Sequence, residues 1–235
     1  MPTRRLLPLQ AVLLTAALLV TGCGGTEGKK KDEPSPSQVM AEAKKKFDEA
    51  SSVHIALATK SVPSEGNGVL GATGDINHDP AFQGDVKVLL ATVTATVPVT
   101  ATGGKVYAKL PFATKYAEID PSEYGAPDPA DFADPDEGLS SLLTQIDGLT
   151  KGKETRKGDQ ILTSYTGTLP GTAVKKIIPS ADAGATYDTT VGVDDEGYAR
   201  TVKITGPFFA DGKDVTYDLV LSKYDAGVKI SAPSA

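Results

Sequence analysis

Cys23, the one cysteine of the chain, is the residue whose type and position point most directly to a chemical reaction. It follows two arginines, an apolar run over residues 6–20 and two small residues, a pattern typical of an export signal. Val20-Thr21-Gly22-Cys23 resembles a bacterial lipobox, in which the cysteine sulfur receives a diacylglyceryl group and the chain is cleaved before it. We therefore expect a lipoprotein signal peptide over residues 1–22 and an acylated Cys23.

Two or three acyl chains on Cys23, such as palmitate, would anchor the protein stably, because stable anchoring needs two membrane-binding groups. The expected location is extracytoplasmic, with the protein lipid-anchored to the cell membrane. Two alternatives stay open: an ordinary secretory signal that leaves a free thiol, and an uncleaved anchor helix. The apolar run of 15 residues is shorter than the ~20 that a transmembrane helix needs. An unpaired cysteine in an exported protein needs an explanation, and the lipobox supplies one.

The other motifs that could bind a ligand or a metal lack the neighbouring residues or structure that such binding needs. Gly66 to Gly71 matches a dinucleotide fingerprint as a string, but strand-like residues follow it instead of a helix. The Gly-Lys pair within 148–153 lacks the spacing of a phosphate loop. His54 and His78 have no partners at metal-ligand spacing, and we expect His54 to be a strand residue with a hydrogen-bonded ring nitrogen. The aspartates within 131–136 lack the glycine position and the closing glutamate of a calcium loop.

No nucleophile constellation accompanies these motifs, because the sequence has no Gly-x-Ser-x-Gly elbow and its cysteine is expected to be acylated. We therefore expect no enzyme, no metal site and no cofactor. The net charge of −6 becomes −8 once the leader arginines are removed. An acidic balance argues against nucleic acid as a partner and against electrostatic adhesion to anionic lipid. Cleavage before Cys23 leaves 213 of the 235 residues, enough for one domain without disulfides.

The helices and strands that would position a site are predicted from the spacing of apolar residues along the chain. Residues 23–34 are a Gly- and Lys-rich flexible tether, and residues 35–235 form a single domain. Ser35, Pro36 and Gln38 predict the start of a helix that ends near residue 51. A second helix is predicted over residues 134–148 and a short third one over 172–178. Alternating apolar residues predict strands over 53–59, 69–76, 82–90, 91–101, 106–110, 161–168, 186–193, 200–206, 215–222 and 228–231.

This series predicts an α+β domain, in which a large antiparallel sheet is covered by helices. Pro98 lacks a backbone donor, which predicts an edge or bulged strand over residues 91–101. The segment 120–136 has four prolines and many acids and is predicted to be a long irregular connection. The small Val and Ala side chains are compatible with a ligand cavity and equally with a close-packed core, and composition does not decide between them.

The mature chain strongly resembles the LppX/LprAFG lipoprotein family of actinobacteria. The residues that carry the resemblance extend over nearly the whole domain and are quoted in chain order: Ser52-Val53-His54-Ile55, Gly74-Asp75-Ile76, Asp79-Pro80-Ala81, Lys105-Val106-Tyr107-Ala108-Lys109-Leu110, Asp134-Pro135 with Gly138-Leu139, Gly167-Thr168-Leu169-Pro170 and Leu221-Ser222-Lys223-Tyr224. Their order and spacing together are more specific than any one of them.

The resemblance implies a half-open antiparallel β-barrel, similar to the LolA and LolB carriers, with helices packed on the concave face of a strongly curved sheet. Between them it implies an apolar cavity for the acyl chains of glycolipids or triacylglycerols, which the protein would carry between envelope layers. An acylated lipid and, through Cys23, the membrane are the implied partners. The alternative is a structural module with a collapsed pocket that serves a partner protein such as a membrane transporter. The residues expected to line the cavity are Leu57, Val69, Ile76, Val86, Val88, Val106, Leu139, Leu142, Leu143, Ile146, Ile177, Val191, Val202, Ile204 and Leu219.

Overall fold

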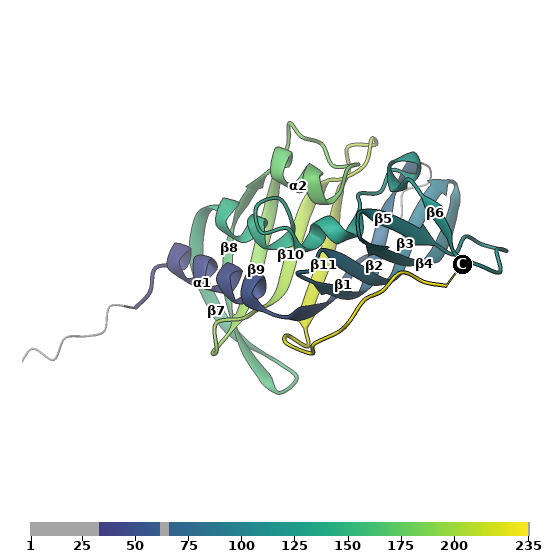
Figure 1. Ribbon diagram of the computed structural model, residues 1–235. Helices are drawn as coiled ribbons and strands as arrows, with labels where there is room; N and C mark the ends of the chain where they lie inside the picture. The colour runs from purple at the N-terminus through teal and green to yellow at the C-terminus, as the bar shows by residue number, and fades with distance from the viewer. Residues whose placement is uncertain (1–32, 62–65, 235) are drawn as a thin grey trace, which may run out of the picture. The chain divides into compact units, whose positions relative to one another are not determined.

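The structure, a computed structural model, describes residues 33–61 and 66–234 (Figure 1). Its strands are β1 (Ser52–Thr59), β2 (Gly66–Asn77), β3 (Ala81–Ala91), β4 (Val93–Thr102), β5 (Lys105–Ala108), β6 (Ala117–Ile119), β7 (Asp147–Lys157), β8 (Gln160–Pro170), β9 (Thr186–Asp194), β10 (Ala199–Pro207) and β11 (Asp214–Ser222). Its helices are α1 (Pro36–Glu49), α2 (Gly171–Ile177) and the 3₁₀ turns η1 (Pro121–Tyr124), η2 (Pro129–Ala133) and η3 (Leu139–Gln145).

All the described strands belong to one antiparallel sheet of 11, in the order β6-β5-β4-β3-β2-β1-β11-β10-β9-β8-β7. Strands β1 to β6 form one meander and β7 to β11 another, and the pairing of β1 with β11 joins the two. No pairing between β6 and β7 closes the sheet within the described residues, so the sheet is open. Helices α1 and α2 lie over the half of the sheet that contains β7 to β11 (Figure 1).

Helix α1 begins at the predicted residue. Ser35 Oγ accepts a hydrogen bond from the backbone N–H of Gln38 at 3.3 Å, and Gln38 Oε1 accepts one from the N–H of Ser35 at 2.8 Å. This reciprocal pair satisfies two of the donors that a helix start leaves without intrahelical partners. Met40, Ala43 and Phe47 then share one buried face. The helix therefore docks on the core through the face that its sequence periodicity predicts.

A partly buried polar link fastens α1 to η3. Lys44 Nζ donates to Asp48 Oδ2 at 2.6 Å, and the hydroxyl of Ser140 donates to the other oxygen of Asp48 at 2.5 Å. Because both partners lie largely out of solvent, the pair is screened less than a surface ion pair. It fixes the N-terminal helix against the segment that carries the buried leucines.

Close strand contacts in the first meander depend on glycine. Gly74 of β2 and Gly84 of β3 lie directly opposite each other. A Cβ on Gly84 would overlap the carbonyl oxygen of Thr73 and the Cα of Gly74, and the ring of Phe82 lies beside it. Glycine is therefore required here by the approach of two backbones.

The prediction of an edge or bulged strand over residues 91–101 is wrong for the strand as a whole, because β4 pairs with β3 without a register shift and with β5 over residues 99–102. Pro98 nevertheless lies where its missing donor costs little. Its carbonyl oxygen accepts from the N–H of Lys109 at 2.9 Å, one residue beyond the end of β5. The N–H that Pro98 lacks would point to the same side, where β5 has just ended.

The helix predicted over residues 134–148 is wrong in type and length, because the structure has a 3₁₀ helix over Leu139–Gln145. Gly138 breaks the predicted helix with an extended backbone, φ −82° and ψ −164°. Its missing Cβ permits three carbonyl oxygens, among them those of Asp131 and Asp134, to approach closely. The hydroxyl of Ser141 donates to the carbonyl of Gly138 at 2.8 Å, and such local bonds compete with α-helical pairing. The leucines are buried as expected, since positions i and i+3 share a face in either helix type.

Strands β6 and β7 were not expected from the sequence, and the strand expected over residues 228–231 is absent, since that segment has no regular structure. Nearly every residue of β7 is exposed, so its sequence has no apolar alternation to announce a strand. The expectations that fall on residues 1–32, including the signal peptide, Cys23 and most of the tether, lie outside the described residues. Among the helices of the described residues, none has the length and apolar character needed to cross a membrane.

Candidate functional site

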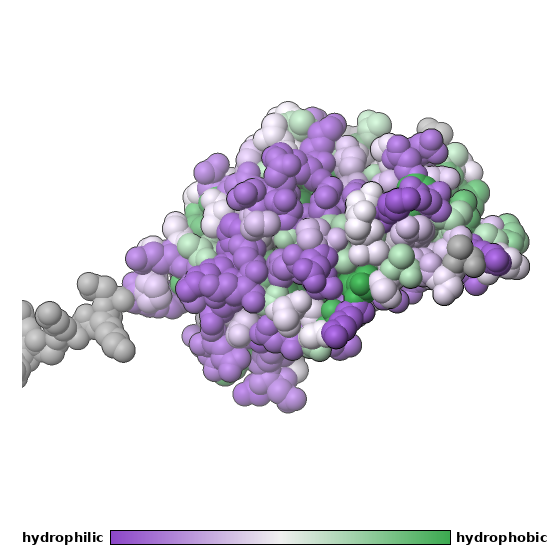
Figure 2. All heavy atoms as spheres, viewed as in Figure 1, coloured by the Kyte–Doolittle hydropathy of each residue, from purple (hydrophilic) through white to green (hydrophobic). Residues whose placement is uncertain are grey.

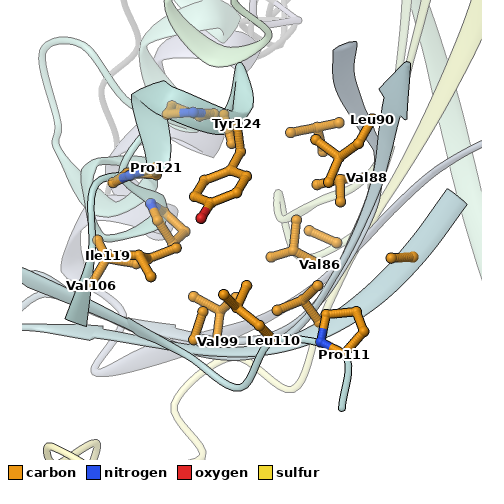
Figure 3. A pocket seen from close by; sticks show the side chains of 18 of the residues that line it. Val86, Val88, Leu90, Val99, Val106, Leu110, Pro111, Ile119, Pro121 and Tyr124 are labelled. Atoms are coloured by element: carbon orange, nitrogen blue, oxygen red, sulfur yellow. The ribbon is translucent and has the colours of Figure 1, made fainter. Parts of the chain in front are cut away.

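An apolar pocket of about 90 Å³ lies between the first meander of the sheet and the segment that follows β6 (Figure 3). Four strands supply its wall, and in β3, β4 and β5 every second residue faces the pocket. In β2 a register shift between Val69 and Gly71 interrupts the alternation. The wall residues are Val69 and Ala72 of β2, Val86, Val88 and Leu90 of β3, Ala95, Val97 and Val99 of β4, and Val106 and Ala108 of β5. Most are Val or Ala, and short side chains leave space that longer ones would fill.

The opposite side of the pocket is the covering segment, residues 119–133, which includes η1 and η2. Its lining residues are Ile119, Pro121, Tyr124, Ala126, Pro127, Pro129 and Phe132. Tyr124 projects from this segment towards the sheet with its hydroxyl oxygen foremost (Figure 3). It is the one lining residue with a polar side-chain atom, in a pocket that Leu110 and Pro111 complete.

Local turns hold the covering segment in shape. Asp120 accepts hydrogen bonds from the N–H and the hydroxyl of Ser122, at 2.9 and 2.6 Å, and Asp128 accepts from the N–H of Ala130 at 2.9 Å. The two bonds from Ser122 hold the pKa of the Asp120 carboxyl below its usual value. Gly125 has φ +68°, which lets the segment reverse direction between η1 and η2. Proline and Asx turns, and not helix propensity, therefore shape this cover.

His78 connects the end of the covering segment to α1. Its Nε2 lies 2.9 Å from the carbonyl oxygen of Phe47, and its Nδ1 lies 3.2 Å from that of Ala133. His54 has its own partner, since its Nδ1 lies 2.7 Å from Asp75 Oδ1, which confirms the expected hydrogen bond. Both histidines therefore have structural partners. The described residues contain no group of three or more His, Cys, Asp or Glu side chains placed to hold a metal ion.

A second, smaller pocket of about 30 Å³ lies in the other half of the sheet, under η3 and α2. It is lined by Leu57, Leu139, Leu142, Leu143, Val174, Ile177, Ile178, Val202, Ile204, Tyr217 and Leu219. The hydroxyl of Tyr217 donates to the carbonyl of Val69, and burial raises the pKa of this tyrosine. Because Tyr217 lines the second pocket and Val69 the first, this hydrogen bond lies between the two spaces.

All fifteen residues expected to line a cavity are buried. Four of them, Val69, Val86, Val88 and Val106, line the larger pocket. Eight line the smaller one: Leu57, Leu139, Leu142, Leu143, Ile177, Val202, Ile204 and Leu219. The other three, Ile76, Ile146 and Val191, line neither and are packed in the core. Contact of any of the fifteen with a lipid stays a prediction.

Sequence reasoning missed most of the larger pocket. Val97 and Val99 were recognisable, because the alternation in β4 places them on one face with Ala95. The covering segment gave no periodic signal, since prolines and turns control its backbone. Its one available clue was the presence of Tyr124 and Phe132 in a stretch otherwise rich in acids and prolines.

The chain thus combines an open antiparallel sheet with an apolar pocket beneath a short covering segment. The chain belongs to the LppX_LprAFG lipoprotein family, whose model matches residues 35–230, and this confirms the resemblance noted from the sequence.

Two solved structures have the same fold. LprF from Mycobacterium bovis superposes with a TM-score of 0.72 at 19% identity, covering 86% of this chain and 99% of that one. LppX from Mycobacterium tuberculosis superposes with a TM-score of 0.61 at 19% identity, covering 85% and 100%. A comparison with curated protein sequences gives no match.

Proposed function

We propose that this protein is a membrane-anchored envelope lipoprotein that binds the acyl chains of lipids and carries them between envelope layers, without catalysis. Glycolipids or triacylglycerols are the proposed ligands. The observation that carries the proposal is the larger pocket, whose lining offers almost nothing but hydrocarbon to an occupant. Family membership supports the same assignment.

The energetics of the pocket suit a reversible carrier. A space of about 90 Å³ holds roughly six to nine water-sized groups at ~10–15 Å³ each, so it takes a comparable number of methylenes. At ~0.8 kcal/mol per methylene removed from water, this contact is worth roughly 5–7 kcal/mol. The same methylenes gain about as much in a bilayer, so exchange between bilayer and protein is close to neutral.

A C16 chain is longer than this space, so its entry requires the cover to move. The covering segment suits that role, because Asx turns and proline turns hold it, whereas the sheet wall is held by continuous strand pairing. Movement of the cover towards solvent would widen the proposed half-barrel and leave its wall intact. In this proposal the hydroxyl of Tyr124, which points from the cover towards the sheet, would bind an ester or another polar group of the lipid.

Lipid co-purification tests the proposal. The mature chain with Cys23→Ser, produced in a lipid-containing host, is measured by native mass spectrometry. We expect bound acyl lipids as mass adducts, and persistently unliganded protein would contradict lipid binding. The same substitution tests the proposed anchor, because Cys23→Ser should release the domain from the membrane fraction, whereas continued extraction by detergent alone would contradict acylation.

The small volume of the two pockets favours one alternative, a module with a collapsed pocket that serves a partner protein such as a membrane transporter. The two functions differ in a direct readout. A carrier binds a fluorescent acyl probe after delipidation, whereas a collapsed module does not.

A further inference from the structure

Two exposed turns at one end of the sheet form an apolar tip, defined here as residues 90–93 and 110–113. Val93 is 64% exposed and the Phe112 side chain is fully exposed, at 106% of its reference area. Among the large hydrophobic side chains of the described residues, four are exposed, and the tip holds two of them. Solvated apolar side chains that occur together mark an interaction site more often than isolated ones do.

The backbone of the tip presents these side chains at a conformational cost. The N–H of Ala113 donates to the carbonyl of Leu110 at 3.0 Å, and Phe112 has φ +70°. A positive φ at the third residue, after Pro111, is the arrangement of a type II turn, in which glycine is the favoured residue. A phenylalanine at that position is both strained and fully solvated, and no packing within the described residues compensates for either cost.

The second turn of the tip also contains a non-glycine residue with a positive φ. Leu90 and Val93 pair across a two-residue hairpin, in which Ala91 has φ +57° at another position that favours glycine. Leu90 and, from the first turn, Leu110 and Pro111 line the larger pocket (Figure 3). The exposed tip is therefore continuous with the pocket wall.

The stretch of sequence that contains both turns of the tip differs in charge from the rest of the chain. Residues 86–117 contain four lysines and no acidic residue, although the whole chain has a net charge of −6. One of the four, Lys105, pairs with Glu118 at 2.8 Å. Lys87 and Lys109 are exposed and lie close to the two turns in sequence. Figure 2 shows hydrophobic side chains intermixed with hydrophilic ones at the end of the molecule where β4 to β6 lie, whereas the face over α1 is mostly hydrophilic.

We propose that the apolar tip inserts into the surface of an anionic lipid bilayer, so that acyl chains pass directly between the bilayer and the larger pocket. The proposal rests on the proposed lipid-binding function. Lysines beside a protruding aromatic side chain suit an anionic lipid surface, to which binding increases with buried apolar area and with charge attraction. A stable protein interface buries ~800 Å² on each partner, which two protruding side chains do not supply.

The tip also lies away from the point where the tether joins the domain. Helix α1, which begins at Pro36, contacts β7 and β10, whereas the tip belongs to β3, β4 and the loop after β5 (Figure 1). The start of α1 and the tip therefore lie in different parts of the domain.

The chain has no tryptophan, so Phe112→Trp supplies a single fluorescent reporter at the tip. The experiment uses the mature chain with Cys23→Ser, which removes binding through the anchor, and vesicles of phosphatidylglycerol and phosphatidylcholine. We expect a blue shift of the emission on vesicle addition and quenching by lipids brominated in their acyl chains. Ile161→Trp, at an exposed apolar residue of the β7–β8 hairpin, is the matched control and should show neither.

The double variant Phe112→Ser/Val93→Ser should bind these vesicles about tenfold more weakly, because insertion depends on the buried apolar area. Its lipid occupancy in native mass spectrometry should stay that of the parent, because neither residue lines the pocket. A parent protein without bound lipid in native mass spectrometry would contradict the proposed function. The vesicle experiment tests the insertion of the tip separately. No blue shift, or equal shifts at residues 112 and 161, would overturn the inference. A shift that requires a membrane protein in the vesicles would overturn it in favour of a protein partner.

Discussion

A tryptophan in the larger pocket should abolish acyl binding and leave the fold intact. Val88 lies in the middle of the β3 wall, 6% exposed, and points at the covering segment (Figure 3). Tryptophan has about seven more heavy atoms than valine, and the pocket of about 90 Å³ holds roughly six to nine water-sized groups. Val88→Trp therefore fills nearly all of the space that we assign to methylenes.

The expected loss follows from that volume. Excluding six to nine methylenes removes roughly 5–7 kcal/mol at ~0.8 kcal/mol each. Since ~1.4 kcal/mol is a tenfold change, the affinity should fall at least a thousandfold. The assay is titration of a C16 fluorescent acyl probe into delipidated, non-acylated protein, with circular dichroism and thermal melting as measurements of the fold.

Lys87→Trp is the matched control, because Lys87 precedes Val88 in the same strand and is exposed on the other face. We expect it to bind the probe like the parent. If Val88→Trp and Lys87→Trp bind equally well and both melt like the parent, the acyl chain does not occupy this pocket. If Val88→Trp instead melts far below the control, the site is a packed core, for which overpacking costs ~1–3 kcal/mol.

Three further substitutions test the scaffold. Gly84→Ala should destabilise the domain by about 2 kcal/mol or more, because its Cβ overlaps Gly74 across the strand pair, and an unchanged melting temperature would contradict this packing. Tyr217→Phe should cost about 1–2 kcal/mol in denaturant unfolding, because it leaves the buried carbonyl of Val69 without its donor, and an unchanged midpoint would refute that role. Backbone N–H groups lower the pKa of Asp134, so its stabilisation is present above the ordinary value near 3.8 and is lost as the pH falls through the lower folded pKa. Asp134→Ala should thus destabilise the domain more at pH 7 than at acidic pH, and the difference should stay below about 1 kcal/mol because this carboxylate is exposed and screened by solvent, whereas an equal effect at both pH values would contradict the linkage.

The strands of the sheet were largely predictable, because in most of them one face is buried and the other solvated. In β4, for example, Val97 and Val99 are buried whereas Thr94 and Thr96 are exposed, and this alternation specifies both the strand and its inner face. Strand β7 was not predictable for the same reason, since both of its faces are exposed and no alternation results. Backbone hydrogen bonds to β8 hold this strand in place, and such bonds do not require any pattern of polar and apolar side chains.

The candidate site was predictable only in part. The valines of the sheet wall follow from alternation, but the cover does not, because Pro121, Gly125 and Pro129 impose turns that no periodicity describes. The leucines of η3 were correctly expected to be buried, although the helix type was wrong. Their spacing fits both helix types, and the close approach of carbonyls to Gly138 decides between them.

The open sheet leaves two edges that a second copy of the chain could extend. The edge at β6 offers only three residues, too few to template a neighbouring strand. The edge at β7 is long, but it contains Lys151, Lys153, Arg156 and Lys157, and its pairing with β8 has irregular register. Like charges and broken register oppose the stacking of one copy on another. An open sheet with these two edges can therefore reach a high local concentration without polymerising into a continuous sheet.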